Sequence, residues 1–394
     1  MAVISTKNHF QLLALLLSPC KDSATIERLA LAIVDRAFDW RPVVYLSSLH
    51  LCSPLLYQRL QSDRLLPLLP EELQEFLTQL FQLNLERNNE FFQALAEVVR
   101  RLQAIHIEPV LLKGGACIVD NLYGSFGARV IQDLDLLLRP ADLAAATTIL
   151  AELGFEPMAA PEQMPDGLPT DARHHHLPMF VKPDSPVGLE LHFKVAYGQA
   201  GRILDAAAVW QGRCRISCRG LDFFVPDPGQ RLLHNAVHAL LPQTESIRSW
   251  ISLLQLAEFA HLAQRYAAKI DWPAWYAAGC QQGFGNELLA YAVLAQQLMG
   301  MEWPAGLPKK AAARFHARRF LAGGNLLSHP KINTGGLERL RQGGIGLLLR
   351  GYYYARLPGW VWRNVCYAEG PGNLPVRLRY FWRKAMSPRS RGKI

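Results

Sequence analysis

The sequence predicts an α+β fold, with a small mixed sheet flanked by helical regions on its N-terminal and C-terminal sides. Two patterns support this prediction. Residues up to about 105 repeat apolar side chains at helical spacing, and residues from about 106 to 226 alternate short apolar strands with short helices. The chain has 394 residues, half of them hydrophobic. It can therefore bury a large core, and the composition excludes wholesale disorder, collagen-like repeats and disulfide scaffolds.

The first region, 1–105, is predicted to be helical. A helix is expected at 23–38, where apolar residues recur on one face. A longer helix is expected from Pro70 to about Ile105. Proline suits a first helical turn, and the two acids after it suit the positive end of the helix dipole.

The second region, 106–226, is predicted to be an α/β core, and the candidate catalytic residues described below lie in it. Gly154 follows one of its helices as a natural C-cap. The expected strands lie at 109–113, 133–138, 155–158, 175–182 and 188–195, and the expected helices at 116–122 and 140–153.

A helical domain is predicted at 227–307, with helices at 230–240, 247–268 and 287–298. The last region, 308–394, is basic and aromatic-rich. It holds 18 basic residues and two acids, a charge of +16, while the rest of the chain carries 24 basic residues and 31 acids, a charge of −7. A basic block with interleaved aromatics suggests contact with RNA or a membrane surface. A lid packed on the catalytic domain is the alternative.

Seven cysteines are scattered along the chain without zinc-finger spacing. This pattern favours a reducing compartment, so we expect a cytoplasmic protein. No run of 18 apolar residues is present, which predicts the absence of a transmembrane helix.

Two acids interrupt an apolar strand at Asp133 and Asp135. Side chains two apart on a strand share a face, so both carboxylates point the same way. Solvated acids at a strand end are the ordinary explanation of such a pair. Apolar residues run directly into and out of it, however, and unpaired charge is costly in that setting. Carboxylate oxygens suit Mg²⁺.

Glu190 and His192 repeat this alternation on a later strand. If that strand lies beside the first, Glu190 supplies a third carboxylate. Upstream, Lys113 precedes the pair Gly114-Gly115, whose backbone N–H groups could bind phosphate at the start of a helix.

Taken together, Lys113-Gly114-Gly115, Arg129, Asp133-Leu134-Asp135 and the later Glu190-Leu191-His192 resemble the uncharacterised bacterial nucleotidyltransferase family of the DNA polymerase β-like superfamily. The resemblance covers about residues 70–270. It implies a nucleotidyltransferase-type sheet and a metal site in which Asp133, Asp135 and Glu190 hold two Mg²⁺ ions, with Mn²⁺ as the alternative.

The resemblance also implies roles in nucleotide binding. Gly114 and Gly115 would let the backbone approach the β- and γ-phosphates, and Lys113 and Arg129 would neutralise their charge. Arg129 could instead pair with Asp133. Glu190 could also act as general base. His192 would either touch a phosphate or orient Glu190, and a purely structural role for His192 is the alternative.

The implied reaction moves an NMP from an NTP to an unidentified acceptor (a small molecule, peptide or protein) and releases pyrophosphate. Two alternatives remain open. One is a catalytically silent nucleotide-binding module docked to RNA or membrane by residues 308–394. The other is a phosphotransferase on the same scaffold.

Two groups of histidines complete the candidates. Adjacent histidines at 174–176 are expected to start a polar strand near the pocket, because neighbours on a strand face opposite ways and cannot easily share one metal. His234 and His238 lie four apart on one helix face and could line the acceptor side of the cleft. In the later helical region the family usually has an acid soon after an arginine, whereas Arg248 is followed by none until Glu258.

Overall fold

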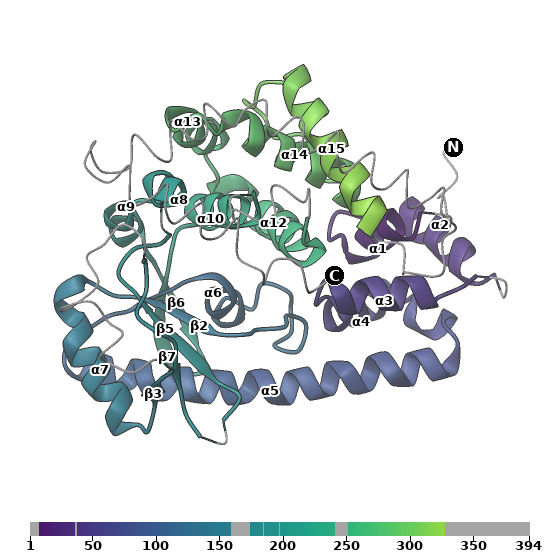
Figure 1. Ribbon diagram of the computed structural model, residues 1–394. Helices are drawn as coiled ribbons and strands as arrows, with labels where there is room; N and C mark the ends of the chain where they lie inside the picture. The colour runs from purple at the N-terminus through teal and green to yellow at the C-terminus, as the bar shows by residue number, and fades with distance from the viewer. Residues whose placement is uncertain are drawn as a thin grey trace, which may run out of the picture. The chain divides into compact units, whose positions relative to one another are not determined.

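The computed structural model describes residues 8–35, 38–158, 174–183, 185–196, 198–240 and 251–327 (Figure 1). The chain divides into two units, Met1–Ile332 and Asn333–Ile394, and only the first contains described residues. Most of the basic region, from residue 328 onward, therefore lies outside the described residues.

The N-terminal region is helical, as predicted. The helix predicted at 23–38 begins at Ser23, where the Asp22 carboxylate accepts the Thr25 N–H, and ends at Ile33. The elements are α1 (His9–Leu17), α2 (Ser23–Ile33), α3 (Arg41–Leu49), α4 (Ser53–Ser62), the 3₁₀ turn η1 (Leu66–Leu68) and α5 (Glu71–Ala104).

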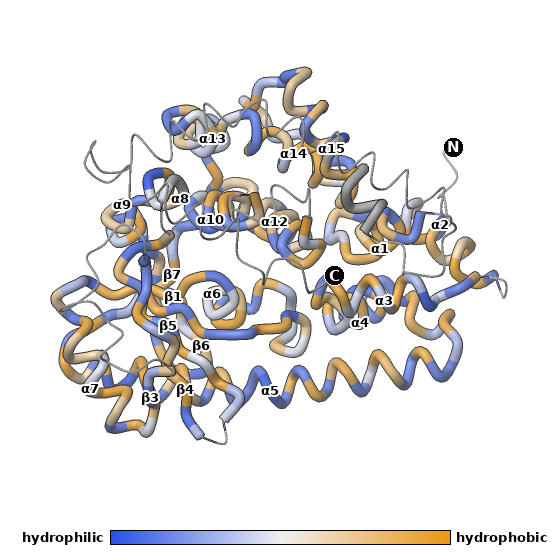
Figure 2. The backbone as a smooth tube through the Cα atoms, in the orientation of Figure 1, coloured by the Kyte–Doolittle hydropathy of each residue, from blue (hydrophilic) through white to orange (hydrophobic). Residues whose placement is uncertain are grey.

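Helix α5 spans 34 residues, about 51 Å at 1.5 Å per residue. Its first half places Leu77 and Phe81 in one hydrophobic cluster with the other N-terminal helices. Its second half places Phe91, Leu95 and Val99 in a separate cluster beneath the sheet. Figure 1 shows α5 running below α6, and Figure 2 shows apolar and polar residues alternating along it.

The described residues form one mixed seven-stranded sheet in the order β3-β4-β5-β2-β1-β7-β6. The β2–β5 and β1–β7 pairs are parallel and the other pairs are antiparallel. The mixed α+β fold is confirmed. The strands are β1 (Val110–Leu111), β2 (Leu134–Leu137), β3 (Glu156–Pro157), β4 (Phe180–Val181), β5 (Gly188–His192), β6 (Cys214–Cys218) and β7 (Leu221–Val225).

The β6–β7 hairpin was not among the strands predicted from sequence. It forms the edge of the sheet, and every residue of β6 is exposed or half-buried, so it lacks the apolar alternation that marks a strand. Arg219 and Gly220 make its turn, with positive φ at both residues.

The helices between the strands are α6 (Lys113–Val119), the 3₁₀ turn η2 (Pro140–Asp142), α7 (Leu143–Glu152), α8 (Gly198–Ile203) and α9 (Ala206–Gln211). Helix α7 is followed by Gly154 at φ +84°, the expected glycine C-cap. Helix α6 begins three residues earlier than predicted. The Gly114-Gly115 pair therefore lies in its first turn and not before it. Leu112 is extended, and the chain turns into the helix at Lys113.

The sheet separates two hydrophobic clusters. On β2, Leu134 and Leu136 face the cluster shared with α7 and the second half of α5. Leu137 faces the cluster shared with the N- and C-terminal helices. Because side chains alternate along a strand, Asp135 points to the same side as Leu137, toward the helical regions.

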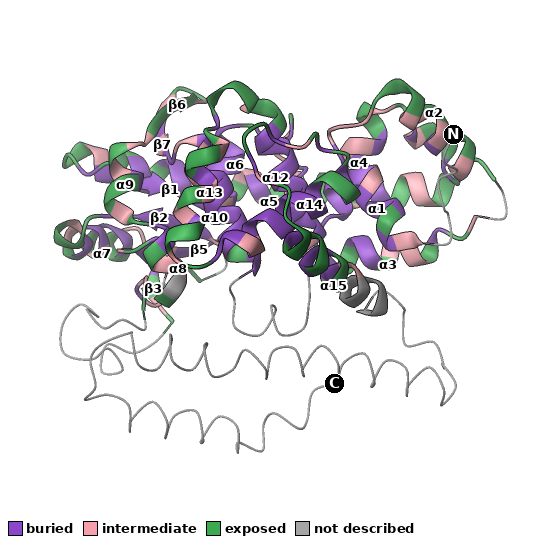
Figure 3. Cartoon of the chain, turned by 90° about the horizontal axis from the view of Figure 1, so that it is seen from above, coloured by how far each residue is buried: buried purple, intermediate pink, exposed green. Residues whose placement is uncertain are grey.

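The C-terminal helices are α10 (Pro228–Leu240), α12 (Leu253–Arg265), the 3₁₀ turn η4 (Ala267–Lys269), α13 (Trp272–Gln281), α14 (Gly285–Met299) and α15 (Ala311–Leu327). The predicted start of α12, at 247–250, lies outside the described residues. Figure 3 shows buried residues concentrated on α6, α10, α12 and α14. Within the described ranges, no helix combines the length and apolar character needed to cross a bilayer.

Candidate functional site

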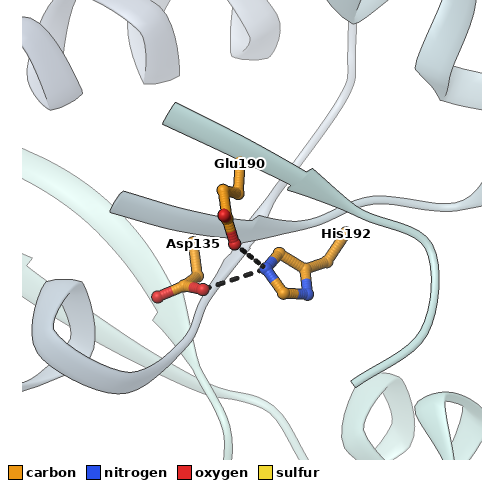
Figure 4. A group of neighbouring side chains, drawn as sticks. All are labelled: Asp135, Glu190 and His192. Atoms are coloured by element: carbon orange, nitrogen blue, oxygen red, sulfur yellow. Dashed lines mark hydrogen bonds and ion pairs between the residues drawn. The ribbon is translucent and has the colours of Figure 1, made fainter. Parts of the chain in front are cut away.

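Three ionisable side chains meet on one face of the β2–β5 pair. The register places Asp135 opposite Glu190 and Leu137 opposite His192, so the strand adjacency required for a third carboxylate is present. The His192 Nε2 atom lies 2.9 Å from Asp135 Oδ1 and 3.2 Å from Glu190 Oε2 (Figure 4). Ligand atoms of all three side chains lie within 4.8 Å of one another.

Asp133 lies one residue before β2 and is half-buried. The group of potential ligand atoms found in the described part of the chain contains Asp135, Glu190 and His192, and does not include Asp133. Asp133 nevertheless interacts electrostatically with the cluster. Its pKa is raised by burial and by the nearby Asp135 carboxylate. Its role as a metal ligand stays a prediction.

Lys113 joins the first turn of α6 to this cluster. Its Nζ atom lies 2.6 Å from Asp135 Oδ1. Burial by itself would lower the pKa of Lys113, but the Asp135 carboxylate outweighs that effect and raises it. The backbone of Lys113 is left-handed, at φ +44°, a conformation that costs a non-glycine residue about 1–3 kcal/mol. Such strain is typical of functional positions.

The charges of the cluster are strongly coupled. Burial would raise the pKa of Asp135, but Lys113 and His192 hold it well below its ordinary value. The pKa of Glu190 is lowered in the same way by its bond to His192, against the effect of burial. The pKa of His192 is raised by both carboxylates, although burial opposes this.

Two buried atoms in this cluster have no hydrogen-bond partner among the described residues: Asp135 Oδ2 and His192 Nδ1. Leaving a buried polar atom without a partner costs about 1–3 kcal/mol. An unpartnered carboxylate oxygen beside a second carboxylate and an imidazole fits a divalent cation.

The two glycines of α6 pack closely against the sheet. A Cβ atom on Gly114 would lie 3.4 Å from Ile131 and 3.7 Å from Arg129 Cζ, and one on Gly115 would lie 3.6 Å from Leu134. Neither glycine has a positive φ. These are ordinary van der Waals distances, so packing by itself does not require glycine at either position, and the phosphate-binding role of the pair stays a prediction.

Arg129 does not pair with Asp133. Its Nε donates to Glu258 Oε2 at 2.8 Å, and its Nη1 donates to the Val130 carbonyl. Glu258, on α12, also accepts bonds from Asn235 at 3.3 Å and from the Tyr123 hydroxyl at 3.4 Å. Burial would raise the pKa of Glu258, but Arg129 lowers it.

The loop that carries Arg129 is held by two buried asparagines of α5. Asn84 Nδ2 donates to the Gly127 carbonyl at 2.8 Å and the Arg129 carbonyl at 3.1 Å. Asn88 Nδ2 donates to the Phe126 carbonyl at 2.6 Å and the Arg129 carbonyl at 2.7 Å. The long helix therefore fixes the backbone beside the acidic cluster.

A small pocket of about 60 Å³ opens beside Lys113, between the first turn of α6 and helices α10 and α12. Its charged and imidazole-bearing walls are Lys113, Arg129, Arg231, His234, His238 and Glu258. The predicted histidine pair of α10 thus lines a pocket next to the site. Asp120 holds Arg231 in place, because the Asp120 Oδ2 atom lies 2.6 Å from Arg231 Nη1.

The histidines at 175 and 176 also come close to the cluster. Both rings lie 5.1 Å from the His192 ring, centroid to centroid, and His176 pairs with His192 through an isolated bridge. His176 Nε2 lies 3.8 Å from Glu190 Oε2. Residues 159–173, just before them, lie outside the described ranges.

A mixed sheet with acids on neighbouring strands, beside a lysine at a glycine-rich helix start, is typical of enzymes that act on phosphate groups. The chain belongs to a family described as uncharacterised nucleotidyltransferase, whose family model matches residues 36–300. That span includes α5, the whole sheet and α10 to α14. The protein is therefore an enzyme that transfers nucleotidyl groups, and a nucleotide is its substrate. No curated protein matches the chain.

Proposed function

We propose that the protein transfers an NMP from an NTP to an acceptor, with Mg²⁺ as its metal and pyrophosphate as its by-product. The acceptor is a small molecule, a peptide or a protein. The observation that carries the proposal is the meeting of Asp135, Glu190 and His192 on adjacent strands, with Lys113 and the first turn of α6 beside them.

Asp133, Asp135 and Glu190 would hold the metal, as two Mg²⁺ ions or as Mn²⁺. The unpartnered Asp135 Oδ2 supports this assignment. When bound, the ions supply charge neutralisation at the attacking and leaving oxygens.

The other roles fall to the chain itself. The acceptor hydroxyl or carboxylate oxygen forms a new bond to the α-phosphorus, and the bond from that phosphorus to the bridging oxygen of the β-phosphate breaks. Glu190 takes the proton of a hydroxyl acceptor, and His192, bonded to Glu190 at 3.2 Å, keeps that carboxylate in place. Lys113 and Arg129 offset the charge of the departing pyrophosphate.

The test uses the full chain with Mg²⁺, cell extract and each NTP, labelled in one set at the α-phosphate and in another at the γ-phosphate. Transfer of the α-label supports nucleotidyl transfer, and transfer of the γ-label would show a phosphotransferase instead. Asp135→Asn should abolish the signal. Asp222→Asn, which removes a carboxylate paired with Arg215 on the exposed hairpin, should keep it. An Asp135→Asn enzyme as active as the wild type refutes the proposed site.

We also propose that the basic C-terminal region docks the enzyme on RNA or on an anionic membrane. The support is its sequence, with 13 basic residues and two acids after residue 327. Truncation after Leu327 keeps α15, which packs into the core through Phe320. Loss of salt-sensitive binding to RNA or to phosphatidylserine vesicles on truncation would support docking. Unchanged binding refutes it.

A further inference from the structure

The pocket beside Lys113 is lined by three cationic side chains, Lys113, Arg129 and Arg231, and by one acid, Glu258. The oxygens of its acid, Glu258, are already engaged by Arg129, Tyr123 and Asn235. Asn235 is also satisfied, since its Nδ2 donates to Gln255 O and its Oδ1 accepts from Tyr291. The pocket therefore suits a ligand that brings several acceptor oxygens of its own.

Cationic donors remain available at this pocket. Lys113 Nζ bonds to Asp135 and to no other described residue, which leaves two of its three protons unused. Arg129 uses Nε and Nη1 within the protein, and its Nη2 makes no hydrogen bond to a described residue. Ligands rich in acceptor oxygens and attracted by such cations are phosphates and related oxyanions.

His234 lines the pocket, and the described part of the fold gives no hydrogen-bonding role to its buried imidazole. Its side chain comes from the middle of α10, it is only 7% exposed, and it makes no hydrogen bond to any residue that the structure describes. Buried polar side chains almost always have partners. Burial and the nearby Lys113 lower the pKa of His234 well below its usual range, so the ring is neutral and keeps one N–H to donate.

The position of the pocket fits one part of the nucleotide. Lys113 touches Asp135 at 2.6 Å and also lines the pocket, so one side chain spans the acids and the pocket. A nucleotide whose α-phosphate lies at the acids would reach the pocket with its next phosphates. The pocket volume of about 60 Å³ holds several waters, at roughly 10–15 Å³ each, which is space for a phosphate-sized group.

We propose that His234 binds the β,γ-diphosphate of the NTP, which leaves as pyrophosphate, by donating a hydrogen bond from its imidazole beside Lys113 and Arg129. The assignment rests on the proposed function for the identity of the substrate. It adds to that function a binding residue from α10, outside the catalytic sheet. It also implies that free pyrophosphate binds the enzyme through the same contacts.

The experiment measures binding of inorganic pyrophosphate, with Mg²⁺, to the full chain by calorimetry. His234→Ala should weaken binding roughly 10- to 100-fold, the scale for one hydrogen bond to a charged group. His234→Asn, which keeps a donor, should lose less and provides a second variant if the alanine protein does not fold. The control is His261→Asn, a buried α12 imidazole that packs on Tyr123 and does not line the pocket.

Wild-type affinity in a folded His234→Ala protein overturns the inference, as does a wild-type enzyme that fails to bind millimolar pyrophosphate. Transfer of the α-label by that same enzyme would then leave the proposed function standing. Conversely, pyrophosphate binding that depends on His234, in a protein that transfers no label, would support the pocket and refute the reaction.

Discussion

Replacement of Glu258 by glutamine should destabilise the protein by about 3 kcal/mol. Glu258 is 6% exposed, and its partner Arg129 has a side chain only 15% exposed. Breaking a buried ion pair by removing one partner costs about 3–5 kcal/mol, because the remaining charge is left uncompensated. Glutamine keeps one acceptor oxygen for Arg129, which places the expected loss at the lower end of that range.

Urea unfolding followed by tryptophan fluorescence measures this loss, since the chain has nine tryptophans. The matched control is Glu152→Gln, whose partner Arg101 and own side chain are each about half exposed, so that its loss should stay below about 1 kcal/mol. The KM for the NTP should rise as well in Glu258→Gln, since Arg129 loses the group that holds it. A Glu258→Gln protein within about 0.5 kcal/mol of the wild type would refute the claim that this pair holds Arg129.

The same pair predicts a pH dependence. The pKa of Glu258 is lowered in the folded state, so the pair contributes its full stability above the ordinary value of 4.5 and loses it as the pH falls through the lower folded pKa. The difference in stability between wild type and Glu258→Gln should therefore shrink below about pH 4.5. A difference that stays constant from pH 7 to pH 3 contradicts this assignment.

Three further changes test the parts around the site. Asn88→Ala should cost about 1–3 kcal/mol in urea unfolding, because the Phe126 carbonyl loses its donor and the Arg129 carbonyl keeps only its bond from Asn84, whereas its neighbour Asn89→Ala should cost less; equal losses would contradict the anchoring role. Gly127→Ala should cost about 1–3 kcal/mol, because the added methyl would lie 2.7 Å from the Phe81 ring, and a wild-type Tm would exclude that clash. Asp135→Asn should lower the rate of α-label transfer at least ~100-fold in a folded protein, and a smaller loss would remove this carboxylate from the chemistry.

The short-range part of the site could be predicted from sequence. Alternation on two apolar strands was enough to place Asp135, Glu190 and His192 on common faces, and the parallel pairing then brought them together. Asp133 is a borderline case, since the strand begins one residue after it.

The long-range part could not be predicted in this way. Arg129 and Glu258 are 129 residues apart, and nothing in the helical pattern around Glu258 distinguishes a buried acid from a solvated one. The apolar periodicity of α5 predicts that the helix face carrying Asn88 is buried. It does not predict that Asn88 donates a hydrogen bond to the carbonyl of Arg129, 41 residues away. A pattern of apolar residues specifies which face is buried, whereas the partner of a buried polar group depends on tertiary packing.

The long helix α5 also determines how the molecule comes apart. One half of it is part of the core of the N-terminal helices, and the other half covers the sheet that carries the acids. Opening either core exposes apolar surface on the same helix, so the two should melt together as one cooperative unit. A fragment that starts at residue 106 would lack the cover of its own sheet. The smallest piece of this enzyme able to fold by itself should therefore include residues 71–104.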